Sequence, residues 1–284
     1  MPLLDYLPLL RCPDDGGSLS PGEGDDVFCS NCGRRFQSRM QRFIDLRPRD
    51  MMTPPSDFES LFERRFFEYY QSIFKGPSER NSNALAWGAP ESFDSKGLRR
   101  KRRQVAEMLG MAEGIVDVAC DVTGGAGHFS LPLASRTRVV FNVDLDMKNL
   151  NYVWTKAESL KIANIILVRG DLFKSPLAHA AFDLTVCTDT LIYGRRMIRS
   201  FLGSIVDSLK TGGIALIDFY NRLHRNPLHK PYLQGYSRAE CESFLSELES
   251  TSSEYRGFFQ EWGGAFSWPI PPTRHVFAVR KLSR

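Results

Sequence analysis

The sequence predicts an α/β protein built on a mainly parallel sheet, and three observations support this. From residue 114 onward, short apolar stretches alternate with segments of helical periodicity, which is the pattern of repeated strand–helix units. A glycine-rich turn follows the first apolar stretch, and an aspartate lies at or just after the end of each of the first three stretches. With 284 residues, 42% hydrophobic and 25% charged, the chain has the composition of an ordinary globular protein.

The elements follow from local patterns. Asp146 is expected to cap the helix after the second strand, and Ser237 with Glu240 has the spacing of a capping box. Gly212 and Gly213 are expected to end a helix in the left-handed conformation. We expect strands at 115–120, 138–143, 164–168, 182–187, 213–219, 255–259 and 274–280, and helices at 129–135, 147–161, 195–209 and 237–248.

The turn after the first strand is the most informative segment. It begins at Asp121 and contains Gly124, Gly125 and Gly127. Glycine reaches positive φ without strain and lets a ligand approach the backbone closely. Because a helix start follows the turn, free N–H groups and the helix dipole meet at the same place. The segment therefore predicts a nucleotide-type binding site.

Three aspartates indicate which ligand this is. Asp121, Asp144 and Asp171 fall at or just after the ends of successive strands. A dinucleotide would use the glycine turn and Asp144, but it would leave Asp121 and Asp171 without a role. A ligand with a cationic amino group, a ribose diol and an adenine would use all three: Asp121 near the amino group, Asp144 on the ribose hydroxyls and Asp171 on the adenine N–H, with Leu172 beside the ring.

On these segments, roughly residues 95–284 resemble the class I S-adenosylmethionine-dependent methyltransferases. Thr123 stands where the first glycine of their acid-x-Gly-x-Gly-x-Gly motif is usual. A β-branched residue fits there if its φ is negative, although it narrows the approach to the cofactor. The resemblance implies a Rossmann-like sheet of seven strands with the last antiparallel. It also implies S-adenosylmethionine as cofactor, bound by Asp121, Thr123, Gly124, Gly125, Gly127, Asp144, Leu145, Asp171, Leu172 and Thr188.

The N-terminal segment carries a possible metal site. Cys12 and Asp15 (or Asp14) have the spacing of one knuckle, and Cys29 and Cys32 that of a second. Three thiolates and one carboxylate can hold zinc, but this set is less common than four thiolates. The alternative is a degenerate ribbon that folds without metal. The segment resembles the small zinc-ribbon proteins that partner tRNA methyltransferases, and the ribbons fused to some rRNA-modifying enzymes, which implies a structural metal.

The chain therefore divides into three expected parts: a β-rich, zinc-ribbon-like segment at 1–50, a helical lid or linker at 51–112, and the methyltransferase domain at 113–284. The aromatic helix predicted at 58–74 either packs against the core or ribbon, or forms a lid over an apolar acceptor. Further aromatic side chains that line such a cleft on this interpretation are Trp87, Trp262, Phe266 and Trp268.

The resemblance places the acceptor near the segment after the fourth strand. Asp189 and Tyr193 are the polar candidates there, although simple loop packing explains them equally well. His224, after the fifth strand, is the first candidate for a base, because a histidine near neutral pKa can deprotonate a hydroxyl or an amine. His128 is expected to line the cofactor pocket or the first helical turn.

The favoured function is methyl transfer to a small-molecule acceptor in specialised metabolism. An RNA methyltransferase is the alternative, suggested by the ribbon and by the basic residues 99–103, but the net charge is only +4 and no Asn/Asp-Pro-Pro-Tyr/Phe element is present. A cofactor-binding protein that does not methylate is the third possibility. Because the sequence has no signal peptide and no apolar stretch of roughly 20 residues, we expect a cytoplasmic protein without a membrane partner.

Overall fold

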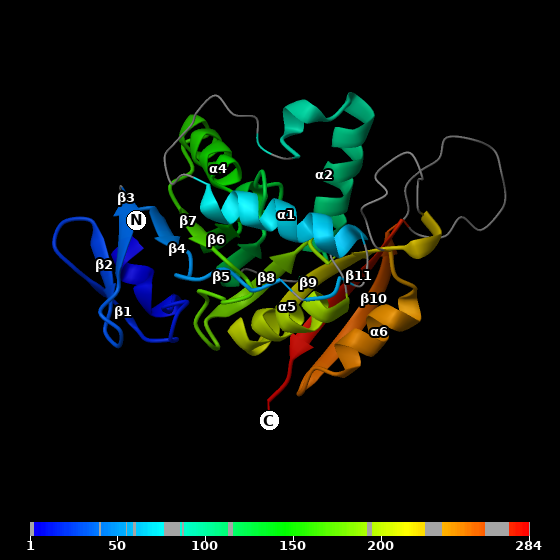
Figure 1. Ribbon diagram of the computed structural model, residues 1–284. Coiled ribbons are helices and arrows are strands. Elements are labelled where there is room, and N and C mark those ends of the chain that lie inside the picture. The colour runs from blue at the N-terminus through cyan, green and yellow to red at the C-terminus, as the bar shows by residue number, and fades with distance from the viewer. Residues whose placement is uncertain are drawn as a thin grey trace.

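The computed structural model describes residues 3–39, 41–54, 56–58, 61–76, 86, 88–112, 116–191, 195–224, 235–258 and 273–283. Within these ranges, one sheet of 11 strands runs through the molecule in the order β1-β2-β3-β4-β7-β6-β5-β8-β9-β11-β10. It forms the middle layer, with helices above and below it (Figure 1).

Five parallel strands form the centre of the sheet. Most of their residues are buried, as expected of strands covered on both faces, and the exposed ones lie near the starts of β5, β6 and β9. These strands are β5 (Val116–Val122), β6 (Thr137–Asp144), β7 (Ile165–Gly170), β8 (Phe182–Cys187) and β9 (Leu209–Tyr220). They lie side by side in the order β7-β6-β5-β8-β9.

A closing hairpin completes the predicted seven strands. β11 (Arg274–Lys281) lies antiparallel to β9 on one side and to β10 (Thr251–Phe258) on the other. The prediction of an α/β sheet whose last strand is antiparallel is therefore confirmed.

The predicted extent of the sheet is wrong, because it has 11 strands rather than seven. β4 (Phe43–Leu46) pairs in parallel with β7 and buries Ile44 and Leu46 completely. Three short antiparallel strands continue from it: β3 (Arg35–Arg39), β2 (Asp26–Cys29) and β1 (Leu19–Pro21). The N-terminal strands thus extend the sheet beyond β7. The short 3₁₀ helix η1 (Leu3–Leu9) comes before β1 in the chain.

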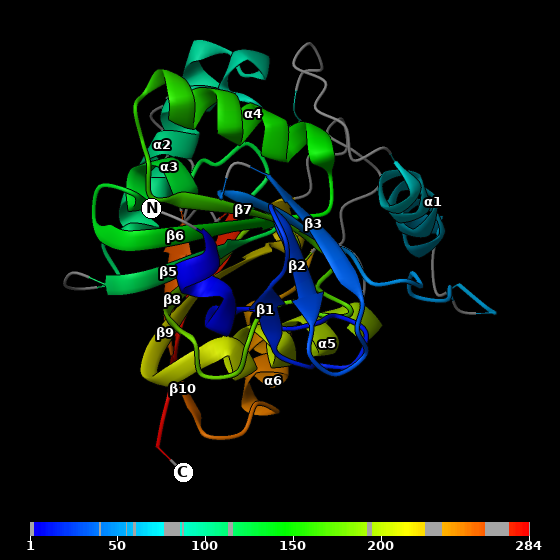
Figure 2. The ribbon, with the colours of Figure 1, turned by 90° about the vertical axis from the view of Figure 1, so that its left-hand side faces the viewer.

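Helices cover both faces of the sheet (Figure 2). α2 (Ser95–Leu109), α3 (Ser130–Leu133) and α4 (Met147–Ser159) lie on one face, and α5 (Arg195–Ser208) and α6 (Arg238–Ser246) lie on the other. The predicted caps are present: Asp146 accepts from the N–H of Lys148, and Ser237 and Glu240 form a complete capping box.

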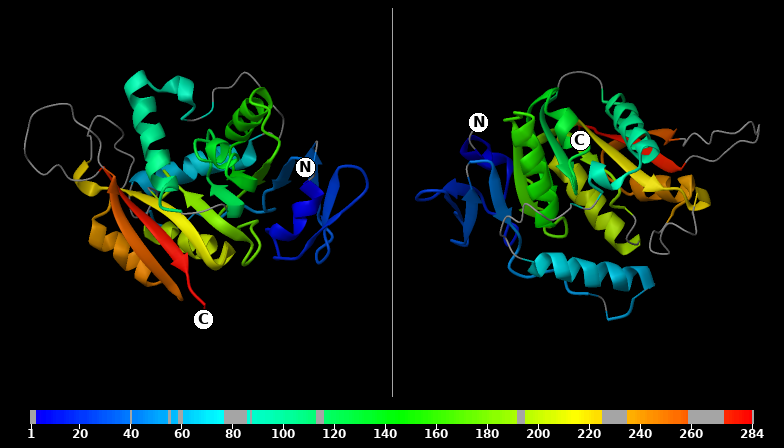
Figure 3. Two further views of the ribbon diagram at one scale, coloured as in Figure 1. Left: turned by 180° about the vertical axis from the view of Figure 1, so that it is seen from behind. Right: turned by 90° about the horizontal axis from the view of Figure 1, so that it is seen from above.

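The predicted aromatic helix is α1 (Leu61–Lys75), which lies at the side of the molecule rather than on either face of the sheet (Figure 3). Its inward side chains Phe67, Tyr70 and Phe74 are buried. The fully buried Arg169 of β7 donates to the carbonyls of Ile73 and Gly76 at the end of this helix, at 3.0 Å each. α1 is therefore attached near the carboxyl end of β7.

One predicted helix end differs from the structure. Leu209 already pairs with Phe182, so β9 begins where a capping loop was expected. Gly212 does have a left-handed φ of +82°, but it lies inside β9, beside an irregularity in the pairing with β8. Within the described ranges, no helix has the length and apolar character that a membrane crossing requires.

Candidate functional site

The glycine-rich turn leaves β5 through an unusual conformation at Thr123. Thr123 has φ +55°, so the negative φ at which a β-branched residue fits easily is not adopted here. The residue keeps the left-handed backbone that a glycine would adopt freely, although a β-branched side chain disfavours it. Its hydroxyl donates to the carbonyl of Val122 at 2.5 Å and is hydrogen-bonded to the hydroxyl of Thr190.

The three glycines of the turn serve different purposes. A Cβ at Gly124 would lie 2.2 Å from Nδ2 of Asn142, and one at Gly127 would lie 2.9 Å from Val153. At Gly125, with φ +51°, the nearest atom to such a Cβ is the carbonyl oxygen of Thr123 at 3.9 Å. Protein packing thus requires Gly124 and Gly127, whereas Gly125 faces the open space that a ligand would fill.

Asp121 lies under the turn and is 2% exposed. Its Oδ2 accepts from the backbone N–H of Ser130 at 2.9 Å and from the Ser130 hydroxyl at 2.6 Å, at the start of α3. Burial raises the pKa of this carboxyl to about 6. Asp121 therefore organises the turn and the first helical residues, and it is the innermost of the three aspartates.

Asp144 ends β6 and contacts the glycine turn directly. Its Oδ2 accepts from the N–H of Gly125 at 2.9 Å and from Asn149 at 3.2 Å, and its Oδ1 accepts from the N–H of Asp146 at 2.7 Å. Burial raises its pKa to about 6. Next to it, the carbonyl of Leu145 accepts from Arg169 at 3.1 Å.

Asp171 follows β7 and contacts α1, which the sequence did not reveal. Its Oδ2 accepts from the hydroxyl of Tyr70 at 2.5 Å, and its Oδ1 accepts from the N–H of Phe173 at 2.9 Å. Asp171 is 3% exposed and Leu172 is 5% exposed, and burial raises the pKa of the carboxyl. The carboxylate expected to meet adenine is thus in contact with a tyrosine of the aromatic helix.

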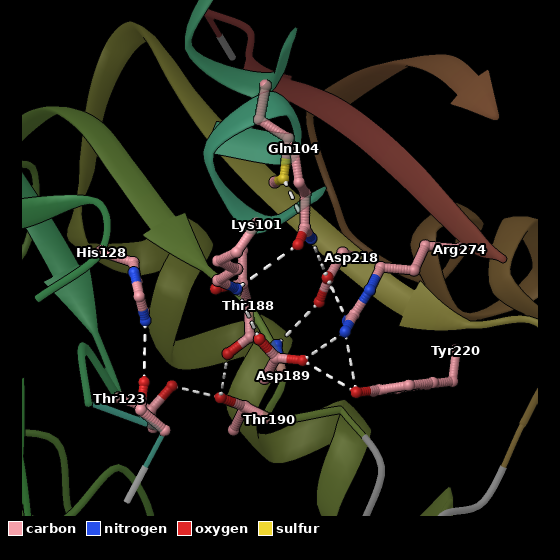
Figure 4. Close-up of polar contacts among 12 residues, drawn as sticks. Lys101, Gln104, Thr123, His128, Thr188, Asp189, Thr190, Asp218, Tyr220 and Arg274 are labelled. Carbon is pink, nitrogen blue, oxygen red and sulfur yellow. Dashed lines mark hydrogen bonds and ion pairs between the residues drawn. The ribbon is translucent and has the colours of Figure 1, made fainter. Parts of the chain in front are cut away.

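A second group of polar side chains surrounds Asp189, after β8 (Figure 4). Its carboxylate contacts Nζ of Lys101 at 2.7 Å and Nη2 of Arg274 at 2.6 Å, and it accepts from the hydroxyl of Tyr220 at 3.0 Å. The side chain of Asp189 is 42% exposed, whereas those of Lys101 and Arg274 are 10% and 13% exposed. The exposed member of the group is therefore the carboxylate.

Asp218 of β9 is the buried carboxylate of this group and contacts three of its residues. It is 1% exposed and accepts from Arg274 at 2.6 Å, from Gln104 at 2.8 Å and from the N–H of Asp189 at 2.8 Å. Burial raises the pKa of Asp218. For Asp189, burial is outweighed by Arg274 and Lys101, which hold its pKa well below the ordinary range. The two cations and two carboxylates balance in charge.

Most of the other residues predicted to lie near the acceptor are not described by the structure. Tyr193 lies outside the described residues, as do Trp87, Trp262, Phe266 and Trp268. The backbone of His224 ends the short helix η3 (Arg222–His224), and its side chain is not among those described. Thr188 is 9% exposed, and its carbonyl accepts from the Thr190 hydroxyl at 3.1 Å.

His128 follows the glycine-rich turn and contacts the segment before α2. Its Nε2 is 2.8 Å from the carbonyl oxygen of Gly88, and its ring packs edge-on against Phe93. Burial lowers its pKa, so the imidazole is neutral at pH 7.

Sequence reasoning missed Lys101, Gln104 and Arg274. The spacing of Lys101 and Gln104 places both on one face of α2, which was the available signal.

The N-terminal cysteines lie in two knuckles of the same backbone form. The N–H of Gly16 donates to the carbonyl of Cys12 at 2.9 Å, and the N–H of Gly33 donates to that of Cys29 at 3.0 Å. Both glycines have left-handed φ, +74° and +70°. Asp15 precedes the first glycine as Cys32 precedes the second, so Asp15 rather than Asp14 takes the ligand position.

The four possible ligand atoms lie close together. Oδ1 of Asp15 is 3.4 Å from Sγ of Cys29, and Sγ of Cys12 is 3.8 Å from Sγ of Cys32. All four atoms lie within 4.8 Å of one another. Asp14 instead pairs with Arg34 at 2.7 Å. The cluster has the size and donor chemistry of a tetrahedral metal site.

Comparison with known proteins agrees with this geometry. Residues 116–217, from the first parallel strand into β9, match the family described as methyltransferase domain. No curated protein matches the chain.

Solved structures support the fold. The N-methyltransferase NodS from Bradyrhizobium japonicum, in complex with S-adenosylhomocysteine, has a TM-score of 0.54 at 16% identity, over 76% of this chain and 98% of that one. The YcgJ protein from Bacillus subtilis has a TM-score of 0.52 at 15% identity, over 64% of this chain and 99% of that one. The chain therefore shares the α/β fold of these two proteins.

Proposed function

We propose that the protein transfers a methyl group from S-adenosylmethionine to a small-molecule acceptor. The observation that carries this proposal is the alignment of Asp121, Asp144 and the open side of Gly125 at the carboxyl ends of β5 and β6. The match to the methyltransferase domain covers both strands. NodS, which has this fold, was solved with S-adenosylhomocysteine.

The residues at the turn fit this cofactor. Gly125 leaves room for it, and Asp144 offers two carboxylate oxygens for the two ribose hydroxyls. Asp121 places negative charge beneath the turn for the cationic amino group, and Thr123, Leu145 and Thr188 are assigned to the walls of the site. Adenine is assigned to Asp171 and Leu172, which requires the hydroxyl of Tyr70 to share or leave the carboxylate.

The acceptor is assigned to the group around Asp189. When bound, S-adenosylmethionine supplies a methyl group on a sulfonium sulfur, and transfer depends mainly on aligning the acceptor atom with it. Asp189 is held by Lys101 and Arg274 and is exposed, so it offers a fixed hydrogen-bond acceptor to an incoming O–H or N–H. Because its pKa is held low, Asp189 positions the acceptor and does not remove its proton.

The charge of this group favours a small molecule over RNA. Its two cations are largely buried and are balanced by Asp189 and Asp218, so it presents no surplus positive charge to a phosphate backbone. His224 remains the candidate base and Tyr193 a polar candidate near the acceptor. His128 adds a neutral imidazole beside the turn. A binding protein without transfer activity remains the alternative if no acceptor is methylated.

Binding of S-adenosylhomocysteine to the Asp144→Ala variant tests the cofactor assignment. We expect the affinity to fall by roughly 1–3 kcal/mol, the cost of leaving polar partners unpaired. Asp117→Ala is the matched control, because Asp117 lies in the same sheet at the other end of β5 and its side chain is 60% exposed. Unchanged calorimetric affinity in Asp144→Ala would exclude the ribose assignment.

We also propose that Cys12, Asp15, Cys29 and Cys32 hold a structural zinc ion. The support is the equivalence of the two knuckles and the close approach of the four ligand atoms. On this proposal residues 1–50 form a zinc-ribbon-like segment, 51–112 a lid or linker that includes α1, and 113–284 the methyltransferase domain. Metal analysis of protein purified without a histidine tag should give about one zinc per chain, and none in Cys29→Ser.

A further inference from the structure

A cavity of about 400 Å³ lies between the N-terminal strands and the end of α1. It is lined by β3, by the segment that follows β4 and by Phe74 of α1. Four arginines line it: Arg34, Arg35, Arg47 and Arg49. The methyl-transfer site does not include any of them.

Two of these arginines are held in place by the protein. Arg34 donates to Asp14 at 2.7 Å and to the carbonyl of Arg47 at 2.8 Å, and its guanidinium lies 4.7 Å from the ring centre of Phe36. Arg47 forms a two-pronged contact with Asp45 and donates to the carbonyl of Phe74 at 2.6 Å. The inner wall of the cavity is therefore rigid and cationic.

The other two arginines are exposed at the rim. The side chain of Arg35 is 80% exposed, and its nearest acid is Asp26 at 3.9 Å. The side chain of Arg49 is 59% exposed and lies 3.4 Å from Asp14, which Arg34 already contacts at 2.7 Å. Neither guanidinium forms a close two-pronged pair with a carboxylate of the described residues.

The charges around the cavity do not balance. Asp14 is shared between Arg34 and Arg49, and Asp45 is shared between Arg47 and the buried Arg169, which it contacts at 3.6 Å. Burial is the main cause that lowers the pKa of Arg169 to about 10; Asp45 opposes this change, and the nearby charge of Arg47 contributes to it. The cavity therefore has an excess of positive charge.

We propose that this cavity binds the phosphate group of a small phosphorylated ligand. Guanidinium groups match the oxygens of phosphate in charge and in planar, paired geometry. A volume near 400 Å³ falls in the range of small-molecule sites and accommodates a phosphate together with the group that carries it. Arg34 and Arg47 form the fixed wall, and Arg35 and Arg49 close over the anion from the rim.

Calorimetric titration with glycerol 3-phosphate and inorganic phosphate tests this proposal. The double variant Arg35→Gln/Arg49→Gln should weaken both by about tenfold or more, the cost of losing charged hydrogen bonds. Arg136→Gln/Arg256→Gln is the control, because it removes the same charge from two exposed positions elsewhere and should bind as the unmodified protein does.

A single-stranded RNA of twelve nucleotides distinguishes a small phosphate ligand from a nucleic-acid backbone. We expect glycerol 3-phosphate to compete with any RNA that binds here. Equal phosphate binding by the rim variant and the unmodified protein would overturn the proposal. So would the absence of phosphate binding, or RNA binding with a steep salt dependence that glycerol 3-phosphate does not affect.

Discussion

Thr123 combines a β-branched side chain with a left-handed backbone in the glycine-rich turn after β5. Its φ of +55° costs roughly 1–2 kcal/mol relative to a glycine. Its hydroxyl recovers part of this cost through Val122 and Thr190. The hydroxyl of Thr190 in turn contacts the carbonyl of Thr188. Thr123 thus connects the glycine-rich turn to the loop that carries Asp189.

Two substitutions separate the strain at Thr123 from its hydrogen bonds. Thr123→Val removes the hydroxyl and keeps the strain, whereas Thr123→Gly removes both. After the greater backbone entropy of glycine in the unfolded state is allowed for, Thr123→Gly should be the more stable of the two by about 1 kcal/mol. Urea denaturation of both variants measures this difference. A less stable glycine variant would show that the left-handed conformation costs little here.

If Asp121 and Asp144 bind the cofactor as proposed, their burial should make binding depend on pH. Burial raises the pKa of both Asp144 and Asp121 to about 6. Above pH 6 both are ionised and accept hydrogen bonds, and below it each must lose a proton before the ligand binds. Affinity for S-adenosylhomocysteine should therefore fall as the pH drops through 6, by up to about tenfold per unit for each carboxyl.

The Asp144→Asn variant tests whether Asp144 is one of the two groups that must lose a proton before the ligand binds. Because asparagine does not titrate, the slope of the logarithm of affinity against pH, measured by calorimetry below pH 6, should decrease by about one. Asp117→Asn at the exposed end of β5 should leave the slope unchanged. An unaltered slope in Asp144→Asn would mean that another group carries the dependence.

The three aspartates could be located from the sequence, whereas the partners of Asp189 could not. Apolar stretches predict where strands end, and the carboxyl ends of parallel strands lie at the same edge of the sheet. Lys101 and Arg274 reach Asp189 from α2 and β11, which lie 88 and 85 positions away in the chain. No local pattern encodes such contacts, because they depend on how distant elements pack.

At the level of elements, α1 contacts Asp171 through Tyr70. Tyr70 donates to this carboxylate and accepts from the N–H of Met52 at 2.9 Å, while its ring packs against Phe173. If adenine takes the same carboxylate, the helix and the cofactor compete for it. The helical pattern predicted α1 itself but not this contact.

Tyr70→Phe tests the competition. The variant keeps the ring and loses the hydroxyl, so we expect stability to fall by about 1 kcal/mol. Because Asp171 then has one partner fewer, S-adenosylhomocysteine should bind about fivefold more tightly, the equivalent of one hydrogen bond. Thermal unfolding and calorimetry measure the two effects. Tyr69→Phe is the control, since the neighbouring Tyr69 is 41% exposed. Weaker binding in Tyr70→Phe would instead place the Tyr70 hydroxyl in the adenine site.

Strand prediction succeeded where burial was complete and failed at the edge of the sheet. The segment 182–187 matches β8 in both bounds, because it is a short apolar run. β4 is a four-residue strand whose parallel pairing with β7 depends on a partner more than 120 positions away. Its sequence alone does not distinguish it from the antiparallel strands before it, so the sheet was expected to stop at seven strands.

Across the whole molecule, the N-terminal segment and the glycine-rich turn belong to one connected structure. β4 joins the N-terminal strands to β7 through backbone pairing. Side chains follow the same route: Asp14 of the first knuckle pairs with Arg34, and the buried Arg169 connects Asp45 to the carbonyl of Leu145. A change in the stability of the knuckles should therefore change the stability of the entire sheet.

Removal of the proposed zinc tests this connection. If the four ligands bind metal and the sheet unfolds as a unit, a chelator should lower the temperature of a single calorimetric transition, since a metal that binds only the folded state stabilises all that unfolds with it. Asp15→Cys, which completes four thiolates, should retain zinc at higher chelator concentrations. Asp26→Cys is the control, because that residue lies outside the ligand cluster. Two transitions, with only the lower one responding to chelator, would show that the N-terminal segment unfolds independently despite the shared sheet.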